Sequence, residues 1–353
     1  KQPAMMGSTV ITQHGILQIS SPTEQPWIDS NIALVEFDRA FRPRQTPLLD
    51  FHWDLPDALQ QQLGPSTESY LLAIAEAGAL HSDLVLNLHP TLEKALLSEN
   101  DQAWTKWKRV AQYMEFYLGE SGRPVTYPAN VGVMTDNFDT SYEPTNLMAR
   151  QNVPFRILPT TQVTPQDLDG LDLVVVFAQP DAATLRQLTN FVQGGGEAIL
   201  VNLQNQLPGQ SSGGRRVSAD STIYTLGNGK VLEIAGGVAD PGKFSEDVRR
   251  LLGNERLSIS LWNASTIIAI PYKFPGSHSA TGELLNYSAD PMPVQVRFRG
   301  TYSEARYESP DRGSYQVLPI SHQNGFTQFD VPWLNIGGRV HLGTTPDLQR
   351  KTS

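Results

Sequence analysis

Acidic residues end two apolar runs near the N-terminus, and these are the residues best suited to chemistry. Glu36 and Asp38 end the run NIALVEFD, while Asp50 and Asp54 end TPLLDFHWD. If both runs are strands, alternation places the acids of each run on one strand face. Carboxylates placed in this way could act as general acid and base. Acids at strand ends also cap helices or lie in solvated loops, so both interpretations stay open.

The elements that would position these acids alternate between strand and helix. The segment 65–80 has a Ser-Thr start, Glu68 in its first turn and apolar residues at helical spacing, so it predicts a helix. DLVLNLH (83–89) predicts a strand, and 91–120 predicts one or two helices whose aromatic residues pack on the sheet. This order favours a parallel sheet in residues 1–120.

Two further regions follow. Residues 130–255 again alternate strand and helix, from VGVMTD through LDLVVVF to EAILVN, and end in a hairpin around NGK and a helix predicted to stop at Gly253. Residues 256–345 carry short alternating strands typical of a β-sandwich, and residues 346–353 form a tail. The predicted class is α/β followed by all-β.

Composition excludes several functions. With a net charge of −9 the chain is a poor partner for nucleic acid, and its apolar runs are too short for a membrane span. It has no Cys, no G-x-G-x-x-G after a strand and no P-loop, so we expect no cofactor; we also expect no metal. The first residue is Lys1, which suggests a processed chain and favours a periplasmic or extracellular location, although a trimmed or unrecorded start would explain it equally.

The order of these regions resembles that of a known enzyme group. The middle region is similar to a flavodoxin-like, class I glutamine-amidotransferase domain, yet that chemistry uses a cysteine and the chain has none. The run from GELLNYS through ESPD to FDVPWL resembles the small C-terminal β-domain of bacterial glycoside hydrolases. Together they resemble trimeric bacterial β-galactosidases, in which residues 1–120 would be the end of a (β/α)₈ barrel.

The resemblance implies a carbohydrate-active protein that acts on a glycosidic bond through two carboxylates. The catalytic candidates are Glu36, Asp38, Asp50 and Asp54. Trp53 beside these acids could stack on a sugar ring, with His52 and His89 as substrate-binding residues at the same end of the strands. A single Trp near a strand end more often serves packing, so both interpretations stay open.

A closed barrel needs about 250 residues, so the barrel-like region is partial. We therefore expect a homo-oligomer or a partner chain that covers it. The alternative is a non-catalytic, glycosidase-like subunit that serves carbohydrate binding or assembly.

Overall fold

The computed structural model describes residues 11–13, 16–20, 31–53, 64–118, 126–203, 207–210, 213–262, 264–288 and 290–343. These residues divide into two compact units. Among the described residues, the α/β unit contains 36–44 and 128–258, and the sandwich unit contains those from 11 to 35, from 45 to 127 and from 259 onward. Each unit is described by itself.

The α/β unit is built on a seven-stranded sheet in the order β6-β5-β7-β8-β11-β10-β9. The first five strands are parallel, and β10 and β9 add to the edge in antiparallel fashion. The strands are β5 (Val131–Met134), β6 (Phe155–Leu158), β7 (Leu173–Val176), β8 (Glu197–Val201), β9 (Arg215–Arg216), β10 (Ser221–Leu226) and β11 (Gly229–Ile234). Taken in chain order, the parallel strands are arranged 2-1-3-4-5, the order of flavodoxin-like folds. The predicted fold class of this region is confirmed.

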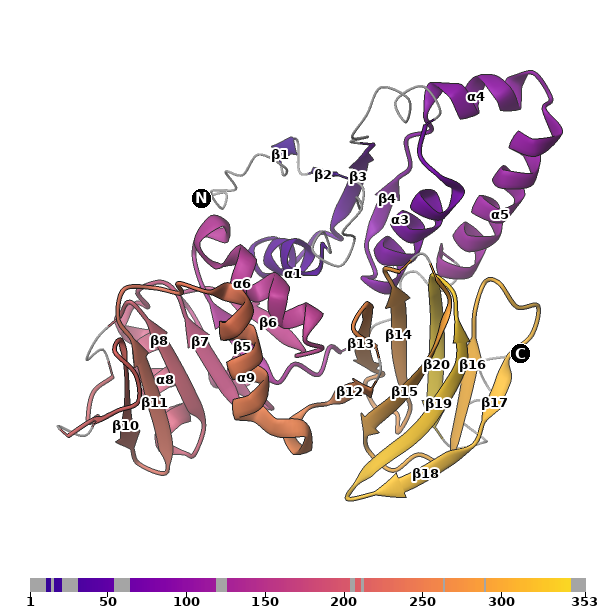
Figure 1. Ribbon diagram of the computed structural model, residues 1–353. Coiled ribbons are helices and arrows are strands. Elements are labelled where there is room, and N and C mark those ends of the chain that lie inside the picture. The colour runs from indigo at the N-terminus through magenta and orange to yellow at the C-terminus, as the bar shows by residue number, and fades with distance from the viewer. Residues whose placement is uncertain are drawn as a thin grey trace. The chain divides into compact units, whose positions relative to one another are not determined.

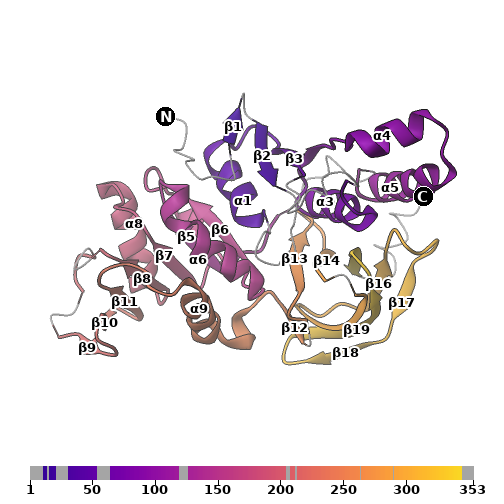
Figure 2. The ribbon, with the colours of Figure 1, turned by 45° about the horizontal axis from the view of Figure 1, so that its top comes forward.

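Helices cover both faces of this sheet (Figure 1). They are α6 (Phe138–Arg150), the short α7 (Pro165–Leu168), α8 (Ala182–Gln193) and α9 (Pro241–Arg256). α6 and α9 pack together, while α8 lies on the opposite face (Figure 2). Because both faces are covered, β5 and β7 are buried at every position, as parallel strands require.

Two helix boundaries differ from the sequence prediction. The run EPTNLMARQN (143–152) has a helical pattern, but α6 begins five residues earlier, at Phe138. Asn137 caps it there, its side chain accepting from the Asp139 N–H at 3.0 Å. The helix predicted to stop at Gly253 instead bends there, at φ 64°, and continues to Arg256. Glycine reaches this left-handed conformation without steric cost, so the chain turns and resumes the helix.

The sandwich unit begins with a four-stranded sheet in the order β1-β2-β3-β4. Its strands are β1 (Ile11–Gln13), β2 (Ile16–Ser20), β3 (Leu48–His52) and β4 (Asp83–Val85). β1 and β2 form a hairpin, and β2, β3 and β4 run parallel. Helices α3 (Thr67–Ala79), α4 (Pro90–Leu97) and α5 (Asp101–Leu118) follow the strands. The predicted parallel sheet is confirmed, although β4 is shorter than the predicted strand.

One predicted strand is wrong. The run NIALVEFD forms helix α1 (Ile32–Phe41), whose residues 32–35 belong to the sandwich unit and 36–41 to the α/β unit. A short continuous apolar run fits a buried strand and a buried helix equally well, because periodicity cannot separate them. Residues 32–35 and Phe37 are all nearly fully buried, as a helix surrounded by protein requires.

Two antiparallel sheets complete the sandwich unit, in the orders β12-β15-β19-β18 and β13-β14-β20-β16-β17. Their strands are β12 (Ile259–Trp262), β13 (Ile267–Lys273), β14 (Ala280–Asn286), β15 (Met292–Arg299), β16 (Glu304–Glu308), β17 (Gln316–Leu318), β18 (Ile320–Gln323), β19 (Phe326–Leu334) and β20 (Gly337–Gly343). Their inner faces share one apolar core that includes Phe298, Tyr307 and Val331. The predicted β-sandwich is confirmed.

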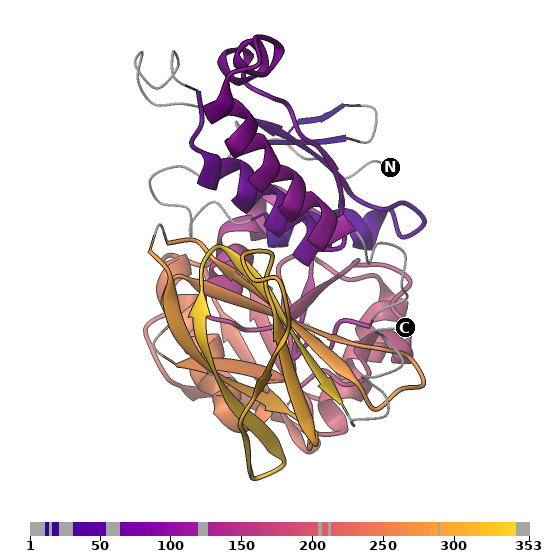
Figure 3. The same cartoon turned by 90° about the vertical axis from the view of Figure 1, so that its right-hand side faces the viewer.

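The sandwich and the helices of the sheet β1 to β4 are joined through a buried carboxyl group. α3 and α5 lie side by side next to the sandwich (Figure 3). Glu76 of α3, 0% exposed, accepts hydrogen bonds from the Asn31 backbone at 2.9 Å, the Asn31 amide at 2.6 Å and the Tyr287 hydroxyl at 2.7 Å. Tyr272 of β13 also donates to the Ala79 carbonyl at 2.9 Å. The helices and the sandwich are therefore one compact unit.

We predict that Glu76→Ala destabilises the protein by about 3 kcal/mol, because it leaves buried donors of Asn31 and Tyr287 without an acceptor. Glu93→Ala, on the exposed face of α4, is the matched control and should change stability by less than about 0.5 kcal/mol. Urea unfolding followed by circular dichroism measures both. Equal midpoints for the two variants would show that the buried carboxyl group is dispensable.

Candidate functional site

The carboxyl ends of β3 and β4 carry a connected set of polar and aromatic side chains. The Asn87 amide, just after β4, donates to Asp50 Oδ1 at 2.5 Å and to the Phe51 carbonyl at 3.3 Å. The Trp53 indole N–H donates to the Asn87 carbonyl at 2.6 Å. We call these three residues, Asp50, Trp53 and Asn87, the rim.

The pleat of β3 decides which way Asp50 points. Leu49 and Phe51 are 0% exposed and face the core, so Asp50 between them faces the other side of the sheet. In the strand register Asp50 pairs with Gln18 of β2 and Val85 of β4. Neither neighbour is an acid, and the amide of Asn87 reaches Asp50. Among the described residues the rim therefore has one carboxylate.

An aromatic contact links the rim to His89. Trp53 packs edge-on against Tyr70 of α3, with ring centroids 4.5 Å apart. The Tyr70 hydroxyl accepts from the His89 backbone N–H at 2.9 Å, and burial raises the pKa of this phenol. His89 caps α4 with Nδ1, which accepts from the Thr91 N–H at 3.3 Å. A neutral His89 in this role therefore carries its proton on Nε2.

His89 and Tyr70 also line a cavity of about 180 Å³ between α3, α4 and α5. Polar residues Asn100 and Lys106 lie on its wall. The cavity is smaller than typical ligand pockets, whose volumes start at roughly 300 Å³. A cavity of this volume is too small for a disaccharide.

The sequence-predicted site residues do not all come together. Trp53 and Asp50 share the rim, and His89 joins them through Tyr70. His52 ends β3, but its side chain, like all of Asp54, lies outside the described residues. Asn87 and Tyr70 were not among the predicted site residues. The polar Asn87 within the apolar run LVLNLH was the available signal for the first, and nothing in helix 65–80 marked the second.

Glu36 and Asp38 lie on helix α1 and belong to the α/β unit, so the predicted placement on one strand face is wrong. Each acid pairs with a nearby arginine: Glu36 with Arg39 of the same helix at 2.5 Å, and Asp38 with Arg42, directly after the helix, at 2.6 Å from Nε. Asp38 is 1% exposed, and burial raises its pKa against the opposing effect of Arg42. These contacts are those of structural ion pairs.

The turn at the carboxyl end of β8 contains one residue in an uncommon backbone conformation. Asn202 follows β8 in a left-handed conformation, φ 56°, which non-glycine residues adopt rarely. A strained turn after a strand holds the nucleophile in several hydrolase folds. Here the side chain is an amide, and the chain has no Cys. This edge has no thiol to act as the amidotransferase nucleophile.

The described ranges contain neither a cluster of metal ligands nor a membrane-spanning helix. No three His, Asp or Glu side chains there come together as a group that could hold a metal ion. No helix among them is long and apolar enough to cross a bilayer.

The fold is similar to solved glycoside hydrolases. It matches the GH42 β-galactosidase Gan42B from G. stearothermophilus with a TM-score of 0.60 and 10% identity, over 92% of this chain and 59% of that one. A β-galactosidase from Bacillus circulans sp. alkalophilus gives 0.58 and 11% identity over 93% and 60%. The chain shares the fold of these glycoside hydrolases. The resemblance predicted from the order of regions is confirmed.

A third match extends beyond β-galactosidases. α-L-Fucosidase isoenzyme 2 from Paenibacillus thiaminolyticus has a TM-score of 0.54 and 12% identity, over 84% of this chain and 60% of that one. The chain thus spans about 60% of the length of these proteins. No family model and no curated protein matches the sequence.

We predict that Asn87→Ala destabilises the protein by about 1 kcal/mol, because Asp50 loses its amide donor at an exposed position. Asn87→Asp should destabilise the protein more than Asn87→Ala does at pH 7, because it places a second carboxylate next to that of Asp50. Asn254→Ala, on the exposed surface of α9, is the control. Urea unfolding measures all three, and an Asn87→Asp variant as stable as the wild type would contradict the contact.

The raised pKa of Asp38 predicts a dependence on pH. A carboxyl group whose pKa is higher in the folded state binds more protons there, so its contribution favours folding as pH falls through the folded pKa towards the unfolded value near 3.9. The wild type should therefore gain stability relative to Asp38→Asn between pH 7 and pH 4.5. Unfolding free energies of both proteins test this, and a constant difference would exclude it.

Proposed function

We propose that this chain binds carbohydrate at the rim of its glycoside-hydrolase-like fold. The observation that carries the proposal is the Asp50–Asn87–Trp53 network, held at the carboxyl ends of neighbouring parallel strands. In barrel enzymes this end of the strands is where ligands bind. The network stands at that position in a fold shared with β-galactosidases and an α-L-fucosidase.

The chemistry of the rim suits a sugar. A carboxylate accepts hydrogen bonds from hydroxyl groups, an amide both donates and accepts, and an indole offers a broad apolar face. The hydrogen bonds among Asp50, Asn87 and Trp53 fix these groups before a ligand arrives. Preorganisation of this kind lowers the entropy cost of binding.

Cleavage of a glycosidic bond is the second proposed function, supported by the likeness to glycosidases. It needs a second carboxylate, about 5 Å from the first for retention or about 6.5–9.5 Å for inversion. Asp54 is the acid that the sequence places beside Asp50. Asp50 as nucleophile or base and Asp54 as acid form the pair to test.

The edge of the sheet β1 to β4 supports a proposal about assembly. β4 is an edge strand among the described residues, and Val85 on it is 38% exposed. Exposed edges of this kind are usually covered, so we propose a second copy or a partner chain over the sheet β1 to β4. A carbohydrate ligand fits a periplasmic or extracellular location.

The rim is tested by sugar titration of the full chain. Galactose and fucose are the probes, and isothermal titration calorimetry is the measurement. We expect Asp50→Asn and Trp53→Ala to weaken binding by about tenfold, equivalent to about 1.4 kcal/mol. Trp104→Ala, another partly exposed tryptophan of the same unit, and Asp101→Asn are the matched controls. If both rim variants bind the sugars with wild-type affinity, the sugar-binding site does not lie at the rim.

Hydrolysis is tested separately with nitrophenyl β-galactoside and nitrophenyl α-L-fucoside. If the wild type turns over either substrate, Asp50→Asn and Asp54→Asn should each abolish the turnover. Unchanged rates in both would exclude this pair. Binding without turnover would leave the rim as a carbohydrate-binding site and overturn the hydrolase function.

A further inference from the structure

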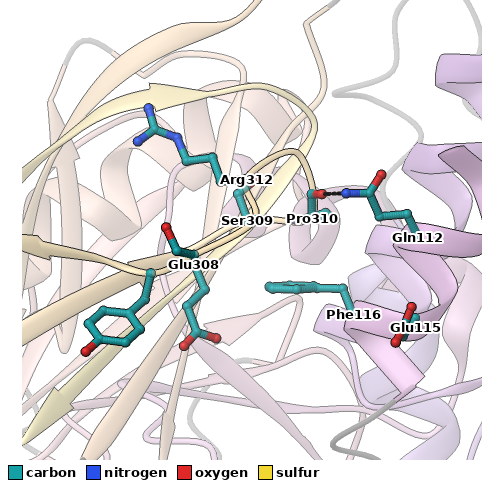
Figure 4. A pocket seen from close by; sticks show the side chains of 10 residues that line it. Gln112, Glu115, Phe116, Glu308, Ser309, Pro310 and Arg312 are labelled. Atoms are coloured by element: carbon teal, nitrogen blue, oxygen red, sulfur yellow. Dashed lines mark hydrogen bonds between the residues drawn. The ribbon is translucent and has the colours of Figure 1, made fainter. Parts of the chain in front are cut away.

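A second and larger pocket lies between α5 and the turn that joins β16 to β17. Its volume is about 500 Å³. Gln112, Glu115 and Phe116 of α5 form one wall, and the segment 308–315 forms the other. Figure 4 shows Phe116 extending from α5 towards the Glu308 side of the pocket. The sequence motif ESPD (308–311) supplies part of this second wall and plays no part in the rim.

The turn is held to α5 by polar contacts of Asp311 and Gln112. Asp311 accepts from the Tyr113 hydroxyl at 2.6 Å and from the Asn335 amide at 2.9 Å, and Arg109 lies 3.5 Å from its other oxygen. Gln112 donates to the Pro310 carbonyl. Burial, with Asp311 beside it, raises the pKa of Tyr113, which therefore stays a donor at neutral pH. The two walls of the pocket are held in place without a ligand.

The side chains on these walls mix acceptors, donors and aromatic rings. The hydrogen bond from His341 holds the pKa of Glu308 below its usual range, so this side chain is a charged acceptor at neutral pH, 32% exposed. Arg312 is a donor that also bonds Gln316 Oε1 at 2.6 Å. Tyr315 is 47% exposed, with the Arg306 guanidinium 4.9 Å from its ring centre.

Charge and size narrow the class of ligand. Glu115 and Glu308 outnumber Arg312, which disfavours an anion such as a phosphate or a sugar acid. The pocket holds no group of three metal-ligating side chains among the described residues, which disfavours a bound cation. Its volume lies in the range of small-molecule sites. Hydroxyl groups can satisfy both the acceptors and the donors, and aromatic rings cover the apolar faces of a sugar.

We propose that the pocket between α5 and the ESPD turn binds an uncharged mono- or disaccharide, at a site separate from the rim. Glu115 and Glu308 accept from ligand hydroxyl groups, while Gln112 and Arg312 line the pocket as donors. Phe116 and Tyr315 supply the apolar surface. The role is binding: it holds a glycan on the protein independently of any reaction at Asp50.

The test uses the full chain and saturation-transfer difference NMR, with lactose and maltose as probes and glucuronate as the charged comparison. Tyr315→Ala should weaken disaccharide binding by about tenfold, and Glu115→Gln by about fivefold. Both positions are exposed, so both variants should fold, which circular dichroism verifies. Trp104→Ala on the same helix and Glu246→Gln on the exposed face of α9 are the matched controls.

The comparison with the rim separates the two proposals. Binding that survives Asp50→Asn and fails in Tyr315→Ala supports this pocket even if the rim binds nothing. Binding that fails in Asp50→Asn and survives in Tyr315→Ala places the sugar at the rim and overturns the pocket. Glucuronate bound as tightly as lactose, or no transfer from either disaccharide, would also overturn it.

Discussion

The sandwich unit depends on one buried contact, the Glu76 carboxyl group. It accepts from Asn31 ahead of α1 and from Tyr287 after β14, residues separated from it by 45 and 211 positions. Burying a carboxyl group away from water costs folding free energy unless its oxygens accept hydrogen bonds. Both oxygens of Glu76 do so. Because the donors come from distant segments, the chain must bring all of them together to avoid that cost. This requirement sets α3 against the sandwich.

Both proposed binding sites follow from that arrangement. Tyr70 on α3 supports Trp53, so the rim is positioned by the same helix that carries Glu76. α5 packs against α3 on one side and meets the ESPD turn through Tyr113 on the other. The guanidinium of Arg339, in a buried ion pair with Glu283 at 2.5 Å, lies 5.1 Å from the ring centre of Phe116. The rim and the second pocket thus each adjoin a helix, α3 or α5, that contacts a buried polar group.

The sequence predicted those elements and site residues that are determined by interactions between neighbours in the chain. The helix 65–80 was predictable because Ser66 caps it, accepting from the Ser69 N–H at 3.1 Å, and Glu68 stands in its first turn. The run NIALVEFD was not, because burial on all sides removes the periodicity that separates helix from strand. Asp50 and Trp53 were predicted together because they are neighbours in sequence. Asn87, 37 residues from Asp50, and the ESPD turn, 198 residues from Gln112, become site residues only through tertiary contacts.

The amide of Asn87 next to Asp50 limits the chemistry that the rim can support. Neighbouring strands lie about 4.8 Å apart, so acids on adjacent strand ends approach the spacing that retaining glycosidases use. Here the adjacent positions hold Gln18 and Val85, and Asn87 reaches across from the end of β4. An amide at hydrogen-bond distance orients a carboxylate and satisfies it, but it cannot donate a proton as a general acid at neutral pH. The strands therefore make Asp50 a fixed acceptor, a role suited to holding a sugar hydroxyl. Catalysis at the same place requires an acid from outside β2, β3 and β4, and Asp54 is the residue the sequence offers for it.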